Sequence, residues 1–214
     1  MTALTLVVGD RNLSSWSLRS WLTLKMAGAV FKEIPVRLRQ PDTKTEIAKY
    51  SPTGKVPVLI HGSLRIWESL AICEYVAEMF PEAHLWPADA ATRALARATA
   101  TEMHGGFTDL RKAMPMDVGA RRPGEGLTPE VADDIRRITT LWSECRERFG
   151  AHGPFLFGDF SIADAMYAPV ATRFVTYDVT LDDDCARYVR TLLALPPMQA
   201  WIAAAAQEQG KTEP

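Results

Sequence analysis

The feature that most constrains the fold is a short apolar strand that begins at a proline, Pro57. The strand runs through Val58–Ile60, turns at 61–63 and returns through Leu64–Trp67. Proline lacks an N–H and suits the first residue of a strand, where no ladder donor is required. A cis bond before proline costs only about 0.5–1 kcal/mol, so we expect a cis Val56–Pro57 peptide at this bend. Such a bend would leave the Val56 N–H and C=O free to pair with a peptide-like ligand.

A helix opens directly after this hairpin, at Glu68 and Ser69. The unpaired N–H groups at a helix N-terminus favour a bound carboxylate. The Glu68 carboxylate would suit an ammonium group. Together with a backbone partner at Val56, these groups predict a site for a small zwitterionic peptide, whereas each part alone also occurs as ordinary structure.

Residues 1–80 alternate between strand-like and helix-like patterns. Apolar runs bounded by Gly, Pro and Asp read as strands, and denser apolar stretches read as helices. The expected strands are 4–8, 30–36, 57–60 and 64–67, and the expected helices are 16–28, 43–50 and 68–79. Pro35 indicates that the second strand lies at an edge of the sheet. The order β-α-β-α-β-β-α predicts an α/β domain of thioredoxin-like topology over residues 1–80.

Beyond a linker at 81–89, strand signals vanish, and residues 90–214 are expected to form an all-helical domain. The predicted helices are 88–112, 129–149, 182–195 and 197–207, with an irregular loop at 114–126 and a solvated tail at 207–214. The pair Gly105-Gly106 suggests a kink or a close approach within the first of them. Ser161 and Asp164 have the spacing of a capping box, so we interpret Asp164 as a structural residue.

Composition excludes several classes of function. The formal net charge is −2, and no basic block suggests nucleic acid as a partner. The three cysteines form no C-x-x-C pair, which is typical of a reducing compartment and argues against a disulfide framework or a zinc site. No signal-peptide pattern and no 18-residue apolar run is visible, so we expect a cytoplasmic protein with no membrane partner. The histidines and acids show no metal-binding spacing, and we expect no metal.

Two serines, Ser14 and Ser15, open the first predicted helix. Their hydroxyls would lie beside unpaired N–H groups and the positive end of the helix dipole, where an anion is stabilised. A thiol placed there loses its proton more readily, and because the cysteines lie elsewhere in the sequence, the thiol would have to arrive with the ligand. The alternative is that the serines only cap the helix. A Ser-His-Asp triad is not indicated, because no G-x-S-x-G motif is present.

Taken together, the order and spacing of these motifs resemble a cytosolic glutathione transferase over essentially the whole chain. The motifs are Ser14-Ser15-Trp16-Ser17-Leu18-Arg19, Lys55-Val56-Pro57-Val58-Leu59, Glu68-Ser69-Leu70-Ala71-Ile72 and Ser161-Ile162-Ala163-Asp164. The serine in the first motif resembles the serine-type classes, namely zeta, theta and their bacterial relatives. Trp16 stands where the zeta class has the Cys of its Ser-Ser-Cys motif, which argues against maleylacetoacetate isomerase activity.

The resemblance implies a thioredoxin-like glutathione-binding domain followed by an all-helical domain that contributes the electrophile pocket. It implies glutathione as co-substrate, a small hydrophobic electrophile and a homodimer. In the implied site, Val56 and Pro57 hold the cysteinyl part, Glu68 and Ser69 the γ-glutamyl part, and Lys44 or Gln40 the glycyl carboxylate. The thiol is activated by Ser14, with Ser15 as the second candidate.

The electrophile pocket is expected between the domains, lined by the loop at Arg11–Leu13 and by His104, Phe107 and Arg111, which helical spacing places on one face. A stripe of this kind is more often core than pocket. The leading function is conjugation of the glutathione thiolate to an electrophile. A glutathione-dependent isomerase or peroxidase, and a non-catalytic glutathione-binding module, are the alternatives.

Overall fold

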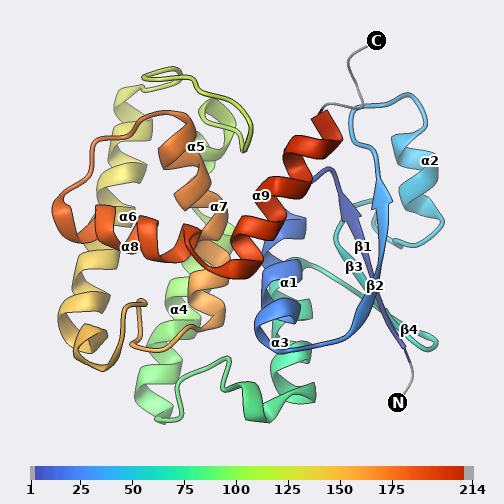
Figure 1. Ribbon diagram of the computed structural model, residues 1–214, viewed down its shortest axis with the longest axis horizontal. Helices are drawn as coiled ribbons and strands as arrows, with labels where there is room; N and C mark the ends of the chain where they lie inside the picture. The colour runs from blue at the N-terminus through green and yellow to red at the C-terminus, as the bar shows by residue number, and fades with distance from the viewer. Residues whose placement is uncertain (1–2, 210–214) are drawn as a thin grey trace.

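The structure is a computed structural model that describes residues 3–209, with a sheet-containing N-terminal half and a helical C-terminal half (Figure 1). The N-terminal half contains β1 (Leu4–Gly9), α1 (Ser15–Met26), β2 (Phe31–Val36), α2 (Thr43–Ala48), β3 (Val58–His61), β4 (Leu64–Trp67) and α3 (Ser69–Met79). This is the β-α-β-α-β-β-α order predicted from the sequence, and the thioredoxin-like fold class is confirmed.

The sheet has the strand order β2-β1-β3-β4. β1 pairs with β2 in parallel and with β3 in antiparallel orientation, and β3 pairs antiparallel with β4. Pro35 therefore lies on an edge strand, as expected. Because helices cover both faces, consecutive residues of β1 are buried: Leu6 faces the large core shared with α1 and α3, and Val7 packs with Ile47 of α2 (Figure 1).

The C-terminal half contains helices throughout. They are α4 (Ala90–Gly105), α5 (Thr108–Ala113), α6 (Pro129–Phe149), α7 (Ile162–Thr176), α8 (Asp183–Leu193) and α9 (Pro196–Gln209), with short 3-10 turns η1 (Pro81–Ala83) and η2 (Gly150–His152). α7 is central, and all its residues except Val175 are buried. The halves meet where α7 packs on α1, and the buried Arg19 Nε donates to the Met166 carbonyl at 3.0 Å.

The predicted helix 88–112 is wrong as a single element, because it breaks into α4 and α5. A Cβ on Gly106 would lie 2.7 Å from the Glu102 carbonyl oxygen, so the backbone approaches too closely there for any other residue. Phe107 follows with φ of 56°, in the left-handed region. The kink or close approach expected at Gly105-Gly106 is therefore present. Because His104 and Arg111 lie on separate helices, they do not share one helical face.

The capping box at the start of α7 is confirmed. The fully buried Asp164 carboxylate accepts hydrogen bonds from the Ser161 N–H at 2.8 Å, the Leu156 N–H at 3.1 Å and the Tyr188 hydroxyl at 2.9 Å. The Ser161 hydroxyl also donates to it at 3.1 Å. Burial raises the pKa of Asp164 to about 6, against the lowering effect of these hydrogen bonds. Asp164 is therefore bonded inward, as a structural residue is.

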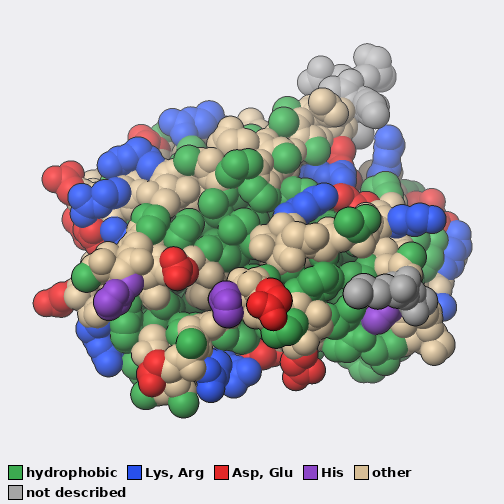
Figure 2. Space-filling model, turned by 60° about the horizontal axis from the view of Figure 1, so that its bottom comes forward, with side chains coloured by type: hydrophobic (Ala, Val, Ile, Leu, Met, Phe, Trp, Pro, Cys, Tyr) green, Lys and Arg blue, Asp and Glu red, His purple; other side chains and the backbone are tan. Residues whose placement is uncertain are grey.

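The last helix, α9, extends to Gln209, two residues beyond the predicted end. Residues 210–214 of the predicted tail lie outside the described part of the chain. Within residues 3–209, no helix has the length and apolar character needed to cross a bilayer. On the face in Figure 2, hydrophobic side chains gather across the middle, whereas lysines and arginines lie mostly toward the rim.

Candidate functional site

A cavity of about 180 Å³ lies where the β3 strand begins and α3 opens. Its lining comes from α1, from the segment before β3 and from the junction of β4 with α3: Trp16, Thr53, Lys55, Val56, Pro57, Trp67, Glu68 and Ser69. The Val56–Pro57 peptide is cis, as expected from the sequence. The structure thus brings together Val56, Pro57, Glu68 and Ser69, which the sequence analysis had grouped.

The backbone of Val56 is available to a ligand. Within residues 3–209, its N–H and carbonyl make no hydrogen bond with another group of the protein. An extended peptide placed along this edge could pair with both groups as an added strand does. Lys55 is exposed beside it and supplies a cation to the same cavity.

The start of α3 is open. The Ser69 side chain is buried, yet its hydroxyl has no hydrogen-bond partner in the described part of the chain. Glu68 is the N-cap residue but makes no capping bond with its side chain, which is 52% exposed. Its backbone has φ of 67° and ψ of 121°, a conformation that residues other than glycine rarely adopt. A bound carboxylate would satisfy the Ser69 hydroxyl and the first N–H groups of this helix.

Trp16 forms the side of the cavity toward the helical domain. The Arg19 guanidinium stacks over its ring at 4.2 Å from the centroid, and that of Arg111 at 5.2 Å. The His104 ring meets it edge-on, with centroids 5.2 Å apart. Residues of α1, α4 and α5 therefore converge on one indole, and the two halves of the chain share this wall.

Positive charge accumulates behind Trp16. Arg19 is fully buried, and both of its terminal nitrogens lack a partner in the described structure, as does one terminal nitrogen of the buried Arg173. Burial lowers the pKa of Arg19, and the neighbouring Arg173 and Arg111 lower it further. No ion pair joins Arg19, Arg111 or Arg173 to a carboxylate within residues 3–209, although Asp134 raises the pKa of Arg111 against the effect of burial. The field of these guanidinium groups favours a nearby anion.

His104 of α4 contacts two residues that line the cavity, Trp16 and Glu68. Its Nε2 lies 3.6 Å from Oε2 of Glu68. Burial lowers the pKa of His104, Arg19 and Arg111 lower it further, and Glu68 opposes them. The lowered pKa favours the neutral form of this imidazole.

The two candidate serines lie at the start of α1 but do not line this cavity. Ser14 is the N-cap residue, and its hydroxyl lies 2.8 Å from that of Ser17. Ser17 in turn accepts a hydrogen bond from the Gly9 N–H at 3.0 Å. The Ser15 hydroxyl makes no hydrogen bond with another described residue, although Ser15 is only 7% exposed. Both readings of these serines, cap and thiol donor, are compatible with this geometry.

The other predicted residues are more scattered. Leu13 and Gln40 line a second cavity, of about 260 Å³, together with Arg37 and Arg39. Lys44 is exposed on α2. Of the predicted electrophile residues, His104 and Arg111 meet at Trp16, and Phe107 is 7% exposed and packs in the core. The sequence analysis missed the lining residues Thr53, Trp67 and, as a wall, Trp16.

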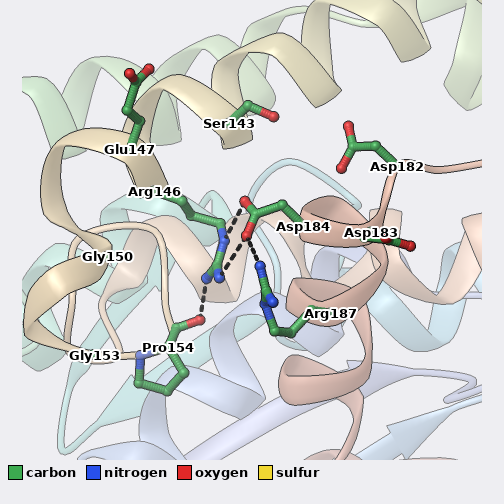
Figure 3. A pocket seen from close by; sticks show the side chains of 10 residues that line it. All are labelled: Ser143, Arg146, Glu147, Gly150, Gly153, Pro154, Asp182, Asp183, Asp184 and Arg187. Atoms are coloured by element: carbon green, nitrogen blue, oxygen red, sulfur yellow. Dashed lines mark hydrogen bonds and ion pairs between the residues drawn. The ribbon is translucent and has the colours of Figure 1, made fainter.

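A larger open groove of about 920 Å³ lies elsewhere, between α6, η2 and α8 (Figure 3). Three of its charged side chains are paired with one another: Asp184 accepts from Arg146 at 2.9 and 3.2 Å and also from Arg187. Arg146 additionally donates to the Pro154 carbonyl. Glu147 and Asp183 also line this groove, and their carboxylates make no ion pair with a described residue. We place the site at the smaller cavity because Val56, the cis peptide, Glu68 and the unpartnered Ser69 hydroxyl meet there. Among residues 3–209, no cluster of three His, Cys, Asp or Glu side chains is arranged to hold a metal ion.

Comparisons with known proteins match both halves of the chain. Residues 13–79 match the family model of the glutathione S-transferase N-terminal domain, and residues 128–204 match that of the C-terminal domain. The chain is 35% identical to glutathione S-transferase Z2 of Arabidopsis thaliana over 87% of this chain and 85% of the relative. It is 27% identical to a probable maleylacetoacetate isomerase of Caenorhabditis elegans over 94% of this chain and 92% of the relative.

Among solved structures, it is similar to a glutathione transferase homolog from Burkholderia with bound glutathione. The TM-score is 0.71 at 27% identity, covering 97% of this chain and 99% of that one. The chain therefore belongs to the glutathione S-transferase family.

Proposed function

We propose that this protein is a glutathione transferase that joins the glutathione thiolate to a small hydrophobic electrophile in the cytoplasm. The observation that carries the proposal is the open start of α3: a buried Ser69 hydroxyl without a partner, in one cavity with Val56 and Glu68. Family membership and the similarity to a glutathione-bound structure support the same ligand.

The γ-glutamyl end of glutathione fits the open helix start. Its α-carboxylate would accept hydrogen bonds from the Ser69 hydroxyl and the adjacent N–H groups. Its ammonium would face the Glu68 carboxylate, between the indoles of Trp16 and Trp67, which also line the cavity and attract cations. The cysteinyl backbone would pair with Val56. For the glycyl carboxylate, Gln40 is supported by its place beside Arg37 and Arg39, whereas Lys44 is exposed on α2 and does not line that cavity.

The reactive sulfur comes from the ligand. Burial raises the pKa of the chain's own Cys73 thiol to about 12, so that thiol is no nucleophile near neutral pH. Ser14 can donate to a bound thiolate if Ser17 turns its hydroxyl toward Ser14, because Ser17 keeps a lone pair for the Gly9 N–H. Ser15 is the second candidate. The dipole of α1 and the buried arginines add a positive field that lowers the pKa of the thiol.

In the proposed reaction the thiol proton leaves to solvent and the sulfur lone pair forms a bond to the electrophilic carbon. A leaving group on that carbon departs with its bonding electrons. The protein contributes binding, orientation and stabilisation of the thiolate.

The test is calorimetry with reduced glutathione and with cysteinylglycine, which lacks the γ-glutamyl group. We expect glutathione to bind at least about tenfold more tightly, since buried groups otherwise lose their charged partner. Equal affinity for both peptides, or no heat with glutathione, would contradict the assigned subsite.

Activation is tested with Ser14→Ala and Ser15→Ala, using a chloronitroarene as electrophile. Ser14→Ala is expected to reduce turnover strongly while leaving glutathione affinity largely intact, and to raise the pKa of the bound thiol measured by ultraviolet absorbance. If the thiol pKa is the same in wild type and Ser14→Ala, then Ser14 does not activate the sulfur.

One specific observation favours a second function, isomerisation, namely the similarity to a probable maleylacetoacetate isomerase over most of both chains. An isomerase would add the thiolate to a conjugated double bond, allow rotation and release glutathione unchanged. Consumption of glutathione during turnover therefore separates the two functions.

We also propose a homodimer. Leu64 and Trp67 are exposed on the edge strand β4, which is consistent with a covered surface there. Light scattering during gel filtration gives the mass that decides between monomer and dimer.

A further inference from the structure

We propose that the C-terminal helix α9 is a positioning element for the serine loop, which we define as residues 10–14 between β1 and α1. This inference rests on the proposed function, because it gives Ser14 its catalytic meaning. Figure 1 shows α9 crossing α1 obliquely, with its C-terminal end toward the loop that follows β1, and the two helices are in contact. The residues that make the connection are Arg11, Glu33, Trp201 and Glu208, and we call them the α9 clamp.

Arg11 is the centre of the clamp. Its backbone N–H donates to Oε2 of Glu208 at 2.8 Å, and its guanidinium donates to the other oxygen of the same carboxylate. Its second terminal nitrogen donates to Glu33 of β2. The sequence had suggested this residue for the wall of the electrophile pocket. In the structure its side chain is held between two carboxylates, each partly shielded from solvent, so it fixes the loop.

Trp201 holds the same residue from a second side. The fully buried indole Nε1 donates to the Arg11 carbonyl at 2.8 Å, and the Arg11 guanidinium lies 5.7 Å from the ring centroid. The ring packs edge-on against Trp21 of α1, with centroids 5.1 Å apart, and Trp21 donates to Glu33 at 2.9 Å. The N–H and the carbonyl of Arg11 therefore bind residues of α9, and its side chain binds both α9 and β2. Trp21 links α1 to the same set through Trp201 and Glu33.

The neighbouring loop residues are held by different elements. Asp10 accepts from the Leu38 N–H at 2.6 Å, and Asn12 donates to Asp117 at 2.7 Å. The loop then closes on itself, because the Ser14 N–H donates to the Asp10 carbonyl at 2.8 Å. Arg11 is the link that depends on α9.

Such a network matters because a catalytic hydroxyl must be placed to within a fraction of an ångström, and a shift of about 1 Å can cost about a hundredfold in rate. Release of Arg11 would let the loop carry Ser14 away from the thiolate while the Val56, Glu68 and Ser69 side of the cavity stays in place. Loss of the clamp should therefore lower kcat and spare glutathione affinity.

The experiment compares wild type with Glu208→Ala, Glu208→Gln and Trp201→Phe. We expect kcat to fall about tenfold in Glu208→Ala and Trp201→Phe. The glutathione Kd from calorimetry should change less than about twofold in Trp201→Phe, because Trp201, unlike Glu208, does not line the cavity that contains Gln40. Glu208→Gln keeps an acceptor for the Arg11 N–H and should recover part of the rate. The pKa of the bound thiol should rise, and the Ser14 amide should exchange faster with deuterium. Both changes should be largest in the variants that lose most kcat.

The matched control is Asp184→Asn, which breaks an ion pair between α6 and α8 far from the site (Figure 3). It should lower Tm without changing kcat, the thiol pKa or Ser14 exchange. The inference is overturned if the clamp variants change kcat no more than this control does, or if Trp201→Phe loses glutathione affinity together with kcat. Glu208 lies on the partly exposed surface, so Glu208→Gln tests the idea even if Trp201→Phe fails to fold.

The wild-type protein separates this inference from the function it rests on. If wild type binds no glutathione, the proposed function fails and takes the catalytic role of the clamp with it. If wild type binds and turns over glutathione but the clamp variants do so equally well, only the clamp fails.

Discussion

The N-termini of α3 and α7 both place a serine and a carboxylate beside unpaired backbone N–H groups, but they differ in whether these side chains bind within the chain. At α7, Ser161 and Asp164 form a closed set in which one buried carboxylate receives four hydrogen bonds from within the chain. At α3, Ser69 is equally buried, but its hydroxyl is left without a partner in the described structure, and Glu68 turns its carboxylate outward in a rarely used backbone conformation. A helix N-terminus whose polar groups are hydrogen-bonded within the chain stabilises the fold. One whose polar groups lack partners can bind a ligand.

The largest expected effect is on stability, at the closed end. Asp164→Ala leaves the Leu156 and Ser161 N–H groups and the Tyr188 hydroxyl buried without an acceptor. At about 1–3 kcal/mol for each such group, we expect the free energy of unfolding to fall by about 3 kcal/mol or more. Urea denaturation measures this. Glutathione affinity of the folded fraction should not change, and a large loss of affinity would mean that the two helix starts are coupled.

The pH dependence of this contribution has a definite sign. The pKa of Asp164 rises from 3.8 to about 6 on folding, so the folded state binds the proton more tightly. The stability from protonation is fully present below pH 3.8 and is lost as pH rises through about 6. The difference in unfolding free energy between wild type and Asp164→Asn should therefore shrink as the pH rises from 3.8 to about 6, by up to about 1.4 kcal/mol per pH unit. A gap that widens with pH would contradict the raised pKa.

At the open end, Glu68 separates function from stability. Glu68→Gly removes the carboxylate and also relaxes a left-handed backbone, so glutathione affinity should fall about tenfold while the free energy of unfolding rises by about 1 kcal/mol. Glu68→Gln is the matched variant, because it keeps the backbone conformation and an acceptor oxygen. It should lose affinity only a few-fold and leave stability unchanged. A loss of stability in Glu68→Gly would show that the conformation is not strained.

The two serines give the most direct comparison. Ser69→Ala removes a hydroxyl that has no partner in the described structure, so stability should change by less than about 0.5 kcal/mol while glutathione affinity falls several-fold. Ser161→Ala removes a capping residue and should cost about 1 kcal/mol of stability with no change in affinity. Calorimetry and thermal unfolding of both variants give the four values. Equal changes in stability and in glutathione affinity for the two variants would contradict the difference between the two helix starts.

The smallest effect concerns His104, which faces Glu68 on one side and Arg19 and Arg111 on the others. Its pKa is lowered, so it is protonated only below its ordinary value of 6.5. The imidazolium would then compete with the ligand ammonium for Glu68. We expect glutathione affinity to weaken by about twofold from pH 7 to 5, and His104→Gln to flatten this dependence. An unchanged profile in His104→Gln would assign the pH effect to another group.

Much of the fold was predictable because it depends on local patterns. The bounds of α6 match the predicted Pro129–Phe149, and the hairpin, the cis peptide and the capping box follow from residues close together in sequence. The same holds for half of the site, since Val56 and Ser69 are joined by one short hairpin.

The rest depends on contacts between distant segments. Apolar spacing in α1 gave no sign that Trp16 faces His104 and Arg111, because a dense apolar helix presents several faces that periodicity alone cannot rank. Arg11 read as a pocket residue because its partners, Glu33 and Glu208, lie 22 and 197 residues away. The break at Gly106 was signalled, but its geometry depends on the Glu102 carbonyl.

The span of the α9 clamp has a consequence for the order of events during folding. The β3–β4 hairpin closes a loop of a few residues, whereas Trp201 and Arg11 are 190 residues apart, and contacts of such long range form late. A refolding molecule should therefore regain the capacity to capture glutathione before it regains turnover. Stopped-flow measurements that follow tripeptide capture and product formation in parallel would show a lag between the two.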